Sequence, residues 1–300
     1  MRILITGVTE THVNHPDRAK STKFASIPEL MRKGFEILGH AVTHRAVRLD
    51  EDFSEFDRVF VYLYPMGANA VSVKQVAHVL QKRMDASICL DDWAFQRILP
   101  TWASTIAQAH LVQRTWVAPL FPWGAASKMG LQVAQINVWD PSPLYLVYGM
   151  PATHQQSWQQ RKTAWYNASL SSDAHIWAQQ QALTWPVHAI GGKALGQKRM
   201  LEADIVWEYG GYKGVLCPTY AHAGCGWWRV RYLHAQQAGC ILGGDPVELA
   251  AIGAPFAYTL QEIEAMSDIQ QAELAISQRH QLQNRLTNLH LTLSNLENLL

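Results

Sequence analysis

The sequence predicts an α/β protein with two parallel-sheet domains. Through residues 2–93, short apolar runs with strand character alternate with stretches of helical periodicity. This alternation favours parallel strands joined by crossover helices. It starts again at Lys162, after a polar and glutamine-rich stretch. A chain of 300 residues with 48% hydrophobic side chains is also large enough to bury two cores.

Apolar runs and helix caps predict the elements of the first domain, which we expect to span residues 1–150. Residues 2–7 are an apolar run ending at Gly7, typical of a buried strand. Ser26, with Pro28 in the first turn and Glu29 three residues after the cap, predicts a helix over 27–40. The remaining predicted elements are strands over 41–47, 58–65, 86–93 and 133–139, helices over 71–83 and 97–114, and a sharp turn at Asp140–Pro143.

A second domain is predicted over 151–260. A strand over 163–166 leads into a helix over 172–183, capped by Ser172 or Asp173. The other predicted elements are strands within 186–192, 201–211, 213–220 and 240–242, and a helix that starts at Arg229 and stops at Gly239. Residues 261–300 carry leucines at three- and four-residue spacing and predict two amphipathic helices. We favour helices packed back across the molecule over a coiled-coil partner site.

Composition excludes several classes of protein. The net charge of +1 gives no global basic signature, so a nucleic-acid binder needs a local basic patch. No stretch resembles a signal peptide or a membrane span. The four cysteines lack CxxC spacing and suit a reducing compartment. We therefore expect a cytoplasmic protein without a membrane partner. The 12 tryptophans exceed what such cores need, which indicates that some line a ligand site or an interface.

The stretch Tyr220–Pro246 carries the sharpest functional signal. A glycine- and tryptophan-rich loop leads into a helix start that holds Arg229 and Arg231. The unpaired N–H groups and dipole of a helix N-terminus attract anions, so two arginines there predict an anion site. The alternative is a pair of solvated arginines on a surface helix. A dinucleotide site after the first strand is disfavoured, because no GxGxxG follows Gly7.

One motif in this stretch resembles a known family. Arg231-x-x-His234-x-x-x-x-Gly239, followed by an apolar strand, is similar to a pattern of the bacteriophage DNA β-glucosyltransferases and hydroxymethylpyrimidine DNA glycosyltransferases. The resemblance implies the GT-B fold, in which two Rossmann-like domains face each other across a cleft and the C-terminal helices pack back. It implies that Arg231 faces the phosphates or ribose of a UDP-sugar donor. His234 stands where the family has a glutamate that binds ribose hydroxyls.

The resemblance extends more loosely to other donor-site positions. The segment Trp165–Ser169 resembles the turn that cradles the donor diphosphate, and Val206–Glu208 resembles the segment beside the uracil. The phosphate-binding arginines of the family are absent at Leu170–Asp173, where Arg229 or Lys213 would have to replace them. The donor-binding candidates are thus Arg231, Arg229, His234, Ser169, Asn167, Trp207 as a stacking surface for the uracil, Tyr220 and Gly7.

Asp91 and Asp92 are the catalytic candidates. They end an apolar strand where parallel α/β sheets bind ligands, and a carboxylate in a closed site takes the proton of an acceptor hydroxyl. Asp92 matches the general base of the family more closely. The alternative is a helix N-cap, and one aspartate can serve each purpose. The pair could also hold a divalent cation, but no third ligand accompanies it, so the sequence requires no cation and predicts no metal site.

The resemblance implies double-stranded phage DNA as acceptor, in the host cytoplasm, and a monomeric enzyme. The hydroxymethylated pyrimidine has to leave the duplex to reach such a site. Candidate DNA contacts are Arg18, Lys20, Lys23 and Arg97 for phosphates, and Trp93 and Trp123 for stacking, or else for interdomain packing. Two alternatives stay open: a GT-B enzyme acting on a small molecule or a cell-envelope glycan, which the near-neutral charge favours, and a non-catalytic nucleotide- or DNA-binding module. The sequence chooses neither the sugar nor between hydroxymethyluracil and hydroxymethylcytosine.

Overall fold

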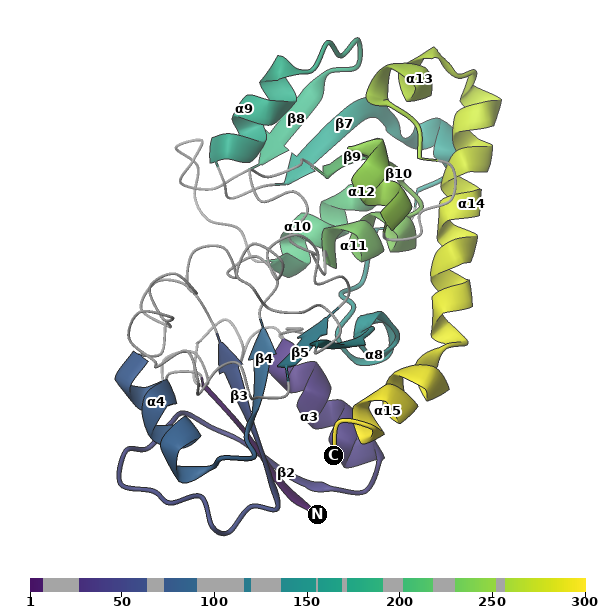
Figure 1. Cartoon of the computed structure of the whole chain (residues 1–300). Helices are drawn as coiled ribbons and strands as arrows, with labels where there is room; N and C mark the ends of the chain where they lie inside the picture. The colour runs from purple at the N-terminus through teal and green to yellow at the C-terminus, as the bar shows by residue number, and fades with distance from the viewer. Residues whose placement is uncertain are drawn as a thin grey trace. The chain divides into compact units, whose positions relative to one another are not determined.

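The chain folds into two compact units, each with its own sheet (Figure 1). The computed structural model describes residues 1–7, 27–63, 73–90, 116–119, 136–154, 156–168, 172–190, 202–217, 230–251 and 257–300. Of these, the residues up to Gly149 and those from Asn288 onward form unit 1, and the described residues between them form unit 2. The chain therefore enters unit 2 after Gly149 and returns to unit 1 after Thr287.

Six parallel strands form the sheet of unit 1, in the order β2-β1-β3-β4-β5-β6. Their bounds are β1 (Arg2–Thr6), β2 (Ala41–His44), β3 (Arg58–Leu63), β4 (Ser87–Leu90), β5 (Trp116–Pro119) and β6 (Ile136–Trp139). Central strands of a parallel sheet are covered on both faces, which explains their continuous apolar runs. Ile3, Leu4 and Ile5 of β1 are accordingly fully buried.

The helices of unit 1 are α3 (Ile27–Ile37), α4 (Val73–Lys82), α8 (Ser142–Tyr148) and the C-terminal α15 (Leu289–Glu297). α15 packs against α3 and α8, and α4 lies on the opposite side of the strands from α3 in Figure 1. Gly34 in α3 makes room for this packing, because a Cβ there would lie 2.3 Å from Cδ1 of Leu296. Thr292 Oγ1 also donates a hydrogen bond to the carbonyl of Asp140 at 2.9 Å.

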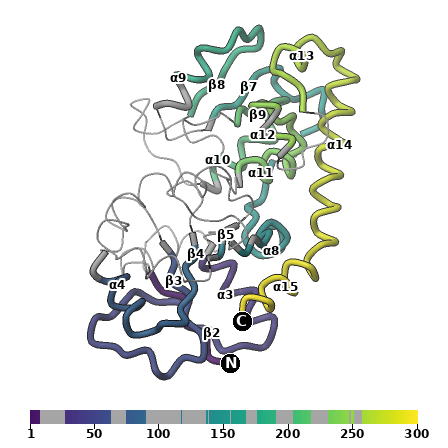
Figure 2. The backbone as a smooth tube through the Cα atoms, viewed as in Figure 1, coloured from purple at the N-terminus to yellow at the C-terminus, as the bar shows by residue number. Residues whose placement is uncertain are grey.

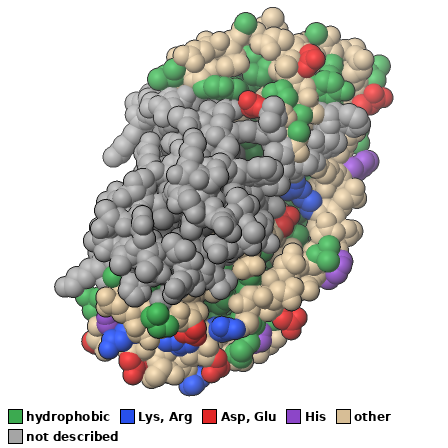
Figure 3. All heavy atoms as spheres, viewed as in Figure 1, with side chains coloured by type: hydrophobic (Ala, Val, Ile, Leu, Met, Phe, Trp, Pro, Cys, Tyr) green, Lys and Arg blue, Asp and Glu red, His purple; other side chains and the backbone are tan. Residues whose placement is uncertain are grey.

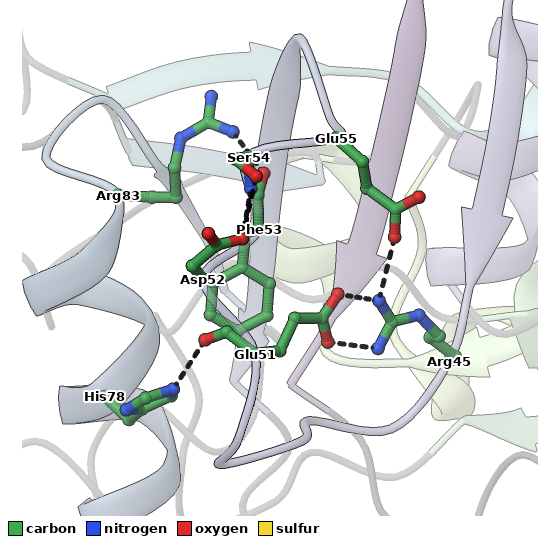
Figure 4. A network of polar contacts seen from close by, with 8 residues as sticks. All are labelled: Arg45, Glu51, Asp52, Phe53, Ser54, Glu55, His78 and Arg83. Atoms are coloured by element: carbon green, nitrogen blue, oxygen red, sulfur yellow. Dashed lines mark hydrogen bonds and ion pairs between the residues drawn. The ribbon is translucent and has the colours of Figure 1, made fainter.

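A polar network holds the connection between β2 and β3 against α4 (Figure 4). Arg45 pairs with Glu51, and Nε2 of His78 on α4 lies 2.9 Å from the carbonyl oxygen of Glu51. Arg83 Nη1 donates to the carbonyl of Phe53 at 3.0 Å. Phe53 is fully buried at φ +62°, a conformation that costs a non-glycine residue about 1 kcal/mol or more. These contacts fix the corner around it.

Four parallel strands form the sheet of unit 2, in the order β10-β9-β7-β8. They are β7 (Lys162–Ala168), β8 (Val187–Ile190), β9 (Tyr212–Cys217) and β10 (Ile241–Gly244). The helices are α9 (Ser172–Gln180), α10 (Glu202–Glu208), α11 (Val230–Ala238), α12 (Pro246–Ala251), α13 (Leu260–Ala265) and α14 (Asp268–Leu286), with 3₁₀ turns at Trp158–Gln160 and Tyr209–Gly211.

Trp165 of β7 organises the core on one face of this sheet. A Cβ at Gly214 of β9 or at Gly243 of β10 would lie 2.4 or 2.5 Å from its indole ring, so glycine on the flanking strands makes room for it. Its Nε1 donates to Glu264 of α13 at 2.7 Å. α14 covers the outer edge of β10, where Gln278 Oε1 accepts from the backbone N of Leu242 at 3.0 Å. Figure 2 traces this tail through α13, α14 and α15.

The sequence predictions of the parallel α/β fold are confirmed, with three corrections to its elements. Residues 202–208 form α10 and not a strand: Ile205, Val206 and Tyr209 turn inward at helical spacing, and the crossover from β8 to parallel β9 uses this helix. The tail holds three helices and not two. The predicted sharp turn at Asp140–Pro143 instead starts α8, whose first turn contains Pro143. No helix among the described segments is long and apolar enough to cross a membrane.

Candidate functional site

The strand order of unit 2 reverses between β7 and β9. The chain passes from β7 outward to β8 and then returns to β9 on the other side of β7. Parallel α/β sheets bind ligands at such a switch point, beside the carboxyl ends of the strands. α11 follows β9 and packs along β9 and β10, so its N-terminal end lies at this carboxyl edge. The N–H groups of its first turn present positive potential there.

Arg231 and His234 lie one turn apart on α11 in different surroundings. Arg231 is the second residue of the helix and is half-buried. His234 is only 2% exposed, and its ring meets Tyr209 edge to face at 6.1 Å between centroids. Burial, reinforced by the charge of Arg231, lowers the pKa of His234 to about 3. At pH 7 His234 is therefore a neutral core residue, and Arg231 supplies the cation of this turn.

Asn167 lies near the same edge on a different face of the sheet. It alternates with Tyr166 along β7 and shares its face with Trp165. Tyr166 packs in the core cluster that α11 joins, and Trp165 packs in the cluster that α13 and α14 join. Asn167 is fully buried. It can therefore approach the surroundings of Arg231 only around the end of β7.

Trp207 and Lys213 lie at the amino end of β9, away from Arg231. Trp207 is next to the last residue of α10, only a 3₁₀ turn before β9 begins. It is 48% exposed and stacks on His154, with 5.4 Å between ring centroids and 15° between planes. The ammonium of Lys213 pairs with Asp268. The structure thus does not bring Trp207 or Lys213 together with the first turn of α11, and their donor roles stay predictions.

Gly7 marks the corresponding switch point of unit 1, between β1 and β3. Its φ is +99°, and a Cβ would lie 2.1 Å from the carbonyl oxygen of Tyr62 on β3. Only glycine fits this close approach. Leu90, the residue before the predicted catalytic aspartates, ends β4 in register with Leu63 at the end of β3. The strand ends of unit 1 thus reach one edge at Gly7, Leu63 and Leu90.

The remaining predicted site residues lie outside the described segments and stay predictions. They are Asp91, Asp92, Ser169, Tyr220, Arg229, Arg18, Lys20, Lys23, Trp93, Arg97 and Trp123. On the described surface of unit 1 drawn in Figure 3, basic and acidic side chains are interspersed, without a patch of one sign. Within the described segments, no group of three His, Cys, Asp or Glu residues could hold a metal ion.

Comparison of the whole chain with solved structures gives full-length matches, including the following two. The structure of T4 phage BGT in complex with its UDP-glucose substrate matches with a TM-score of 0.62 at 12% identity. The structure of a DNA-modifying β-glucosyltransferase, determined in the presence and absence of uridine diphosphoglucose, matches with a TM-score of 0.61 at 9% identity. Each match covers 100% of this chain and 99% of the other. The chain has the GT-B fold.

This GT-B assignment confirms the fold that the sequence resemblance implied. No protein-family model and no curated protein sequence matches the chain. At 9–12% identity the likeness establishes the arrangement of strands and helices, while the roles of single side chains have to come from the chain itself.

Arg161 contacts the C-terminal end of α11 and was not singled out from the sequence. It precedes β7 and is buried, and it donates to the carbonyls of Ala238 and Gly239 at the C-terminal end of α11. Gly239, with φ +70°, was predicted to end this helix. The last carbonyls of a helix need hydrogen-bond donors, so the sequence indicates that some donor lies at Gly239 without indicating which one. Which donor lies there depends on a contact 77 residues apart in the chain.

Proposed function

We propose that the protein is an inverting glycosyltransferase that moves a sugar from a UDP-sugar to the hydroxymethyl group of 5-hydroxymethyluracil or 5-hydroxymethylcytosine in phage DNA. The observation that carries the proposal is the full-length GT-B likeness to a phage enzyme bound to UDP-glucose. Arg231 on the first turn of α11, at the carboxyl edge of the second sheet, supports an anionic donor there. A buried neutral His234 adds no second charge to this turn.

The proposed reaction is a single displacement. The acceptor hydroxyl oxygen attacks the anomeric carbon while the bond from that carbon to the diphosphate oxygen breaks, which inverts the configuration. The hydroxyl proton passes to Asp92, with Asp91 as the alternative base. UDP leaves with the bonding electron pair, and Arg231 and the N–H groups of α11 stabilise its added negative charge. A DNA base has to be flipped out of the duplex to react, and the predicted lysines and arginines would hold the backbone.

Mass analysis of nucleosides tests the reaction directly. The protein is incubated with hydroxymethylated or unmodified DNA and a panel of UDP-sugars, and the digested nucleosides are weighed. We expect one hexose mass on the hydroxymethylpyrimidine nucleoside and none on unmodified DNA. Absence of any increase with every donor would refute DNA as the acceptor. Transfer to a free sugar or other small acceptor would then support the second candidate function, which the net charge of +1 favours.

Two variants test the proposed roles of single residues. Asp92→Asn should abolish transfer and leave UDP affinity intact, with exposed Asp50→Asn as the matched control. Full activity of Asp92→Asn would move the base to Asp91 or elsewhere. Arg231→Ala should weaken UDP binding about tenfold or more through loss of a charge-assisted hydrogen bond. Exposed Arg48→Ala should leave UDP affinity unchanged, and equal affinities of the two arginine variants would refute the donor role.

A further inference from the structure

The helix that presents Arg231 is enclosed by protein for most of its length. The five consecutive residues Tyr232–Gln236 are all buried. Successive side chains of an α-helix point about 100° apart, so five of them cover every direction around the axis. The side chains packed into the core include the small Ala235 and Ala238. The large Tyr232 packs in the same cluster, so apolar packing holds α11 against sideways displacement.

Two backbone N–H groups and the guanidinium of Arg161 donate hydrogen bonds to the last carbonyls of α11. The backbone N–H of Gly239 donates a hydrogen bond to the carbonyl of Gln236 at 3.0 Å, and the N–H of Cys240 donates one to the carbonyl of Ala235 at 2.9 Å. With Gly239 at positive φ, these bonds form a Schellman motif, which satisfies two of the terminal carbonyls. Nη2 of Arg161 donates a hydrogen bond to the carbonyl of Ala238 at 2.8 Å.

Nη1 of the same guanidinium donates a hydrogen bond to the carbonyl of Gly239 at 2.6 Å. Nε of Arg161 donates to the carbonyl of Gln156 at 3.2 Å, which ties the guanidinium to the segment before β7. The side chain is buried, and among the described carboxylates none pairs with it. Its charge therefore faces backbone carbonyls at the negative end of the helix dipole.

We propose that Arg161 is a positioning residue for the donor site, which fixes the axial place of α11 and thereby the place of Arg231 and the first-turn N–H groups. Arg231 and Ala238 are seven residues apart, roughly 10 Å along the axis at 1.5 Å per residue. Arg161 thus acts through the helix and does not touch a ligand at its N-terminal end. This inference rests on the proposed function, because it assumes that UDP binds at that end.

Binding of UDP, measured by titration calorimetry, tests the inference in the full-length protein. Arg161→Met should weaken UDP binding about tenfold, since a displacement of about 1 Å at a charge-assisted contact is enough for such a loss. Arg161→Lys should recover part of the affinity, because an ammonium can bond one carbonyl well and lacks the planar fork. Glu264→Gln is the matched control: it disturbs contacts on the Trp165 side of unit 2 and should bind UDP like the wild type.

A double-mutant cycle separates positioning from general destabilisation. If Arg161 acts through Arg231 and the N–H groups of the first turn, then Arg161→Met should weaken UDP binding by a smaller factor in the Arg231→Ala background than in the wild type. Full additivity would overturn the proposal, as would wild-type affinity of folded Arg161→Met. Should Arg161→Met fail to fold, Arg161→Lys carries the test, and affinity equal to that of Glu264→Gln overturns it. Wild-type protein that binds no UDP refutes the proposed function itself.

Discussion

Replacement of His234 by glutamine should remove a distinct part of the pH dependence of folding. His234 is buried in α11 against Tyr209, and desolvation with the nearby charge of Arg231 lowers its pKa to about 3. In the unfolded chain a histidine titrates near pH 6.5. Between these values the unfolded state binds a proton that the folded state does not bind. Lowering the pH through this window therefore destabilises the fold, and above it the effect vanishes.

The size of the effect follows from this shift. Each pH unit below the unfolded pKa costs about 1.4 kcal/mol, so lowering the pH from 7.5 to 5 should cost about 2 kcal/mol through His234. Glutamine at this position has no proton to gain. His234→Gln should therefore be less stable than the wild type at pH 7.5, by about 1 kcal/mol for imperfect packing, and should lose about 2 kcal/mol less on acidification.

Urea unfolding of both proteins at pH 7.5, 6.5, 5.5 and 5.0, followed by far-UV circular dichroism, measures the difference. The two proteins differ only at position 234, so the difference between the two pH profiles isolates His234. Parallel profiles for wild type and His234→Gln would refute the assignment of a buried, neutral His234. A wild type that gains stability on acidification relative to the variant would refute the sign.

Three further substitutions test the packing described above. Glu264→Ala should lower the free energy of unfolding in urea at pH 7 by about 3 kcal/mol. It leaves the buried Trp165 Nε1 without its acceptor and removes the hydrogen bonds from the backbone N of Thr184 and Trp185. A loss below about 0.5 kcal/mol, the size of a neutral surface change, would contradict this. Gly7→Ala should cost about 3 kcal/mol or more, seen as a lower melting temperature, because its Cβ would meet backbone and not a movable side chain. In Gly34→Ala, a gain in helix propensity of about 1 kcal/mol opposes a cost of about 1–3 kcal/mol from overpacking against the buried Leu296. Faster amide exchange over 289–297 in Gly34→Ala should show α15 loosened, and unchanged exchange would show that Leu296 adapts.

Most of the fold could be predicted because strands such as β1 and β9 are buried on both faces. Ile3, Leu4 and Ile5 of β1 are apolar without alternation, as a central parallel strand requires. The failure at 201–211 has the same origin, since a short apolar run around Ile205 and Val206 fits a buried strand or one face of a helix. Only the need for a crossover between β8 and β9 decides between them. The glycines that accommodate Trp165 could not be predicted, because they depend on pairing of strands distant in the chain.

The candidate site could be predicted where local chemistry defines it. The helix start with Arg231 and the stop at Gly239 are local signals, and the structure has both. Burial of His234 is not local. Its neighbour in space is Tyr209, which enters from the 3₁₀ turn before β9. Likewise, the placement of Trp207 at the amino end of β9 follows from α10 being a helix, which the sequence interpretation missed.

The two ends of α11 have opposite electrostatic requirements, and the chain meets them with two arginines. Arg161 at the C-terminal end lies where the helix dipole is negative and stabilises the fold there. Arg231 at the N-terminal end lies where the dipole is positive, which by itself disfavours a cation. His234, one turn further along, is buried and neutral and adds no charge of its own to this end of the helix. An anion bound at the first turn of α11, as we propose, would meet both the positive end of the dipole and the Arg231 guanidinium.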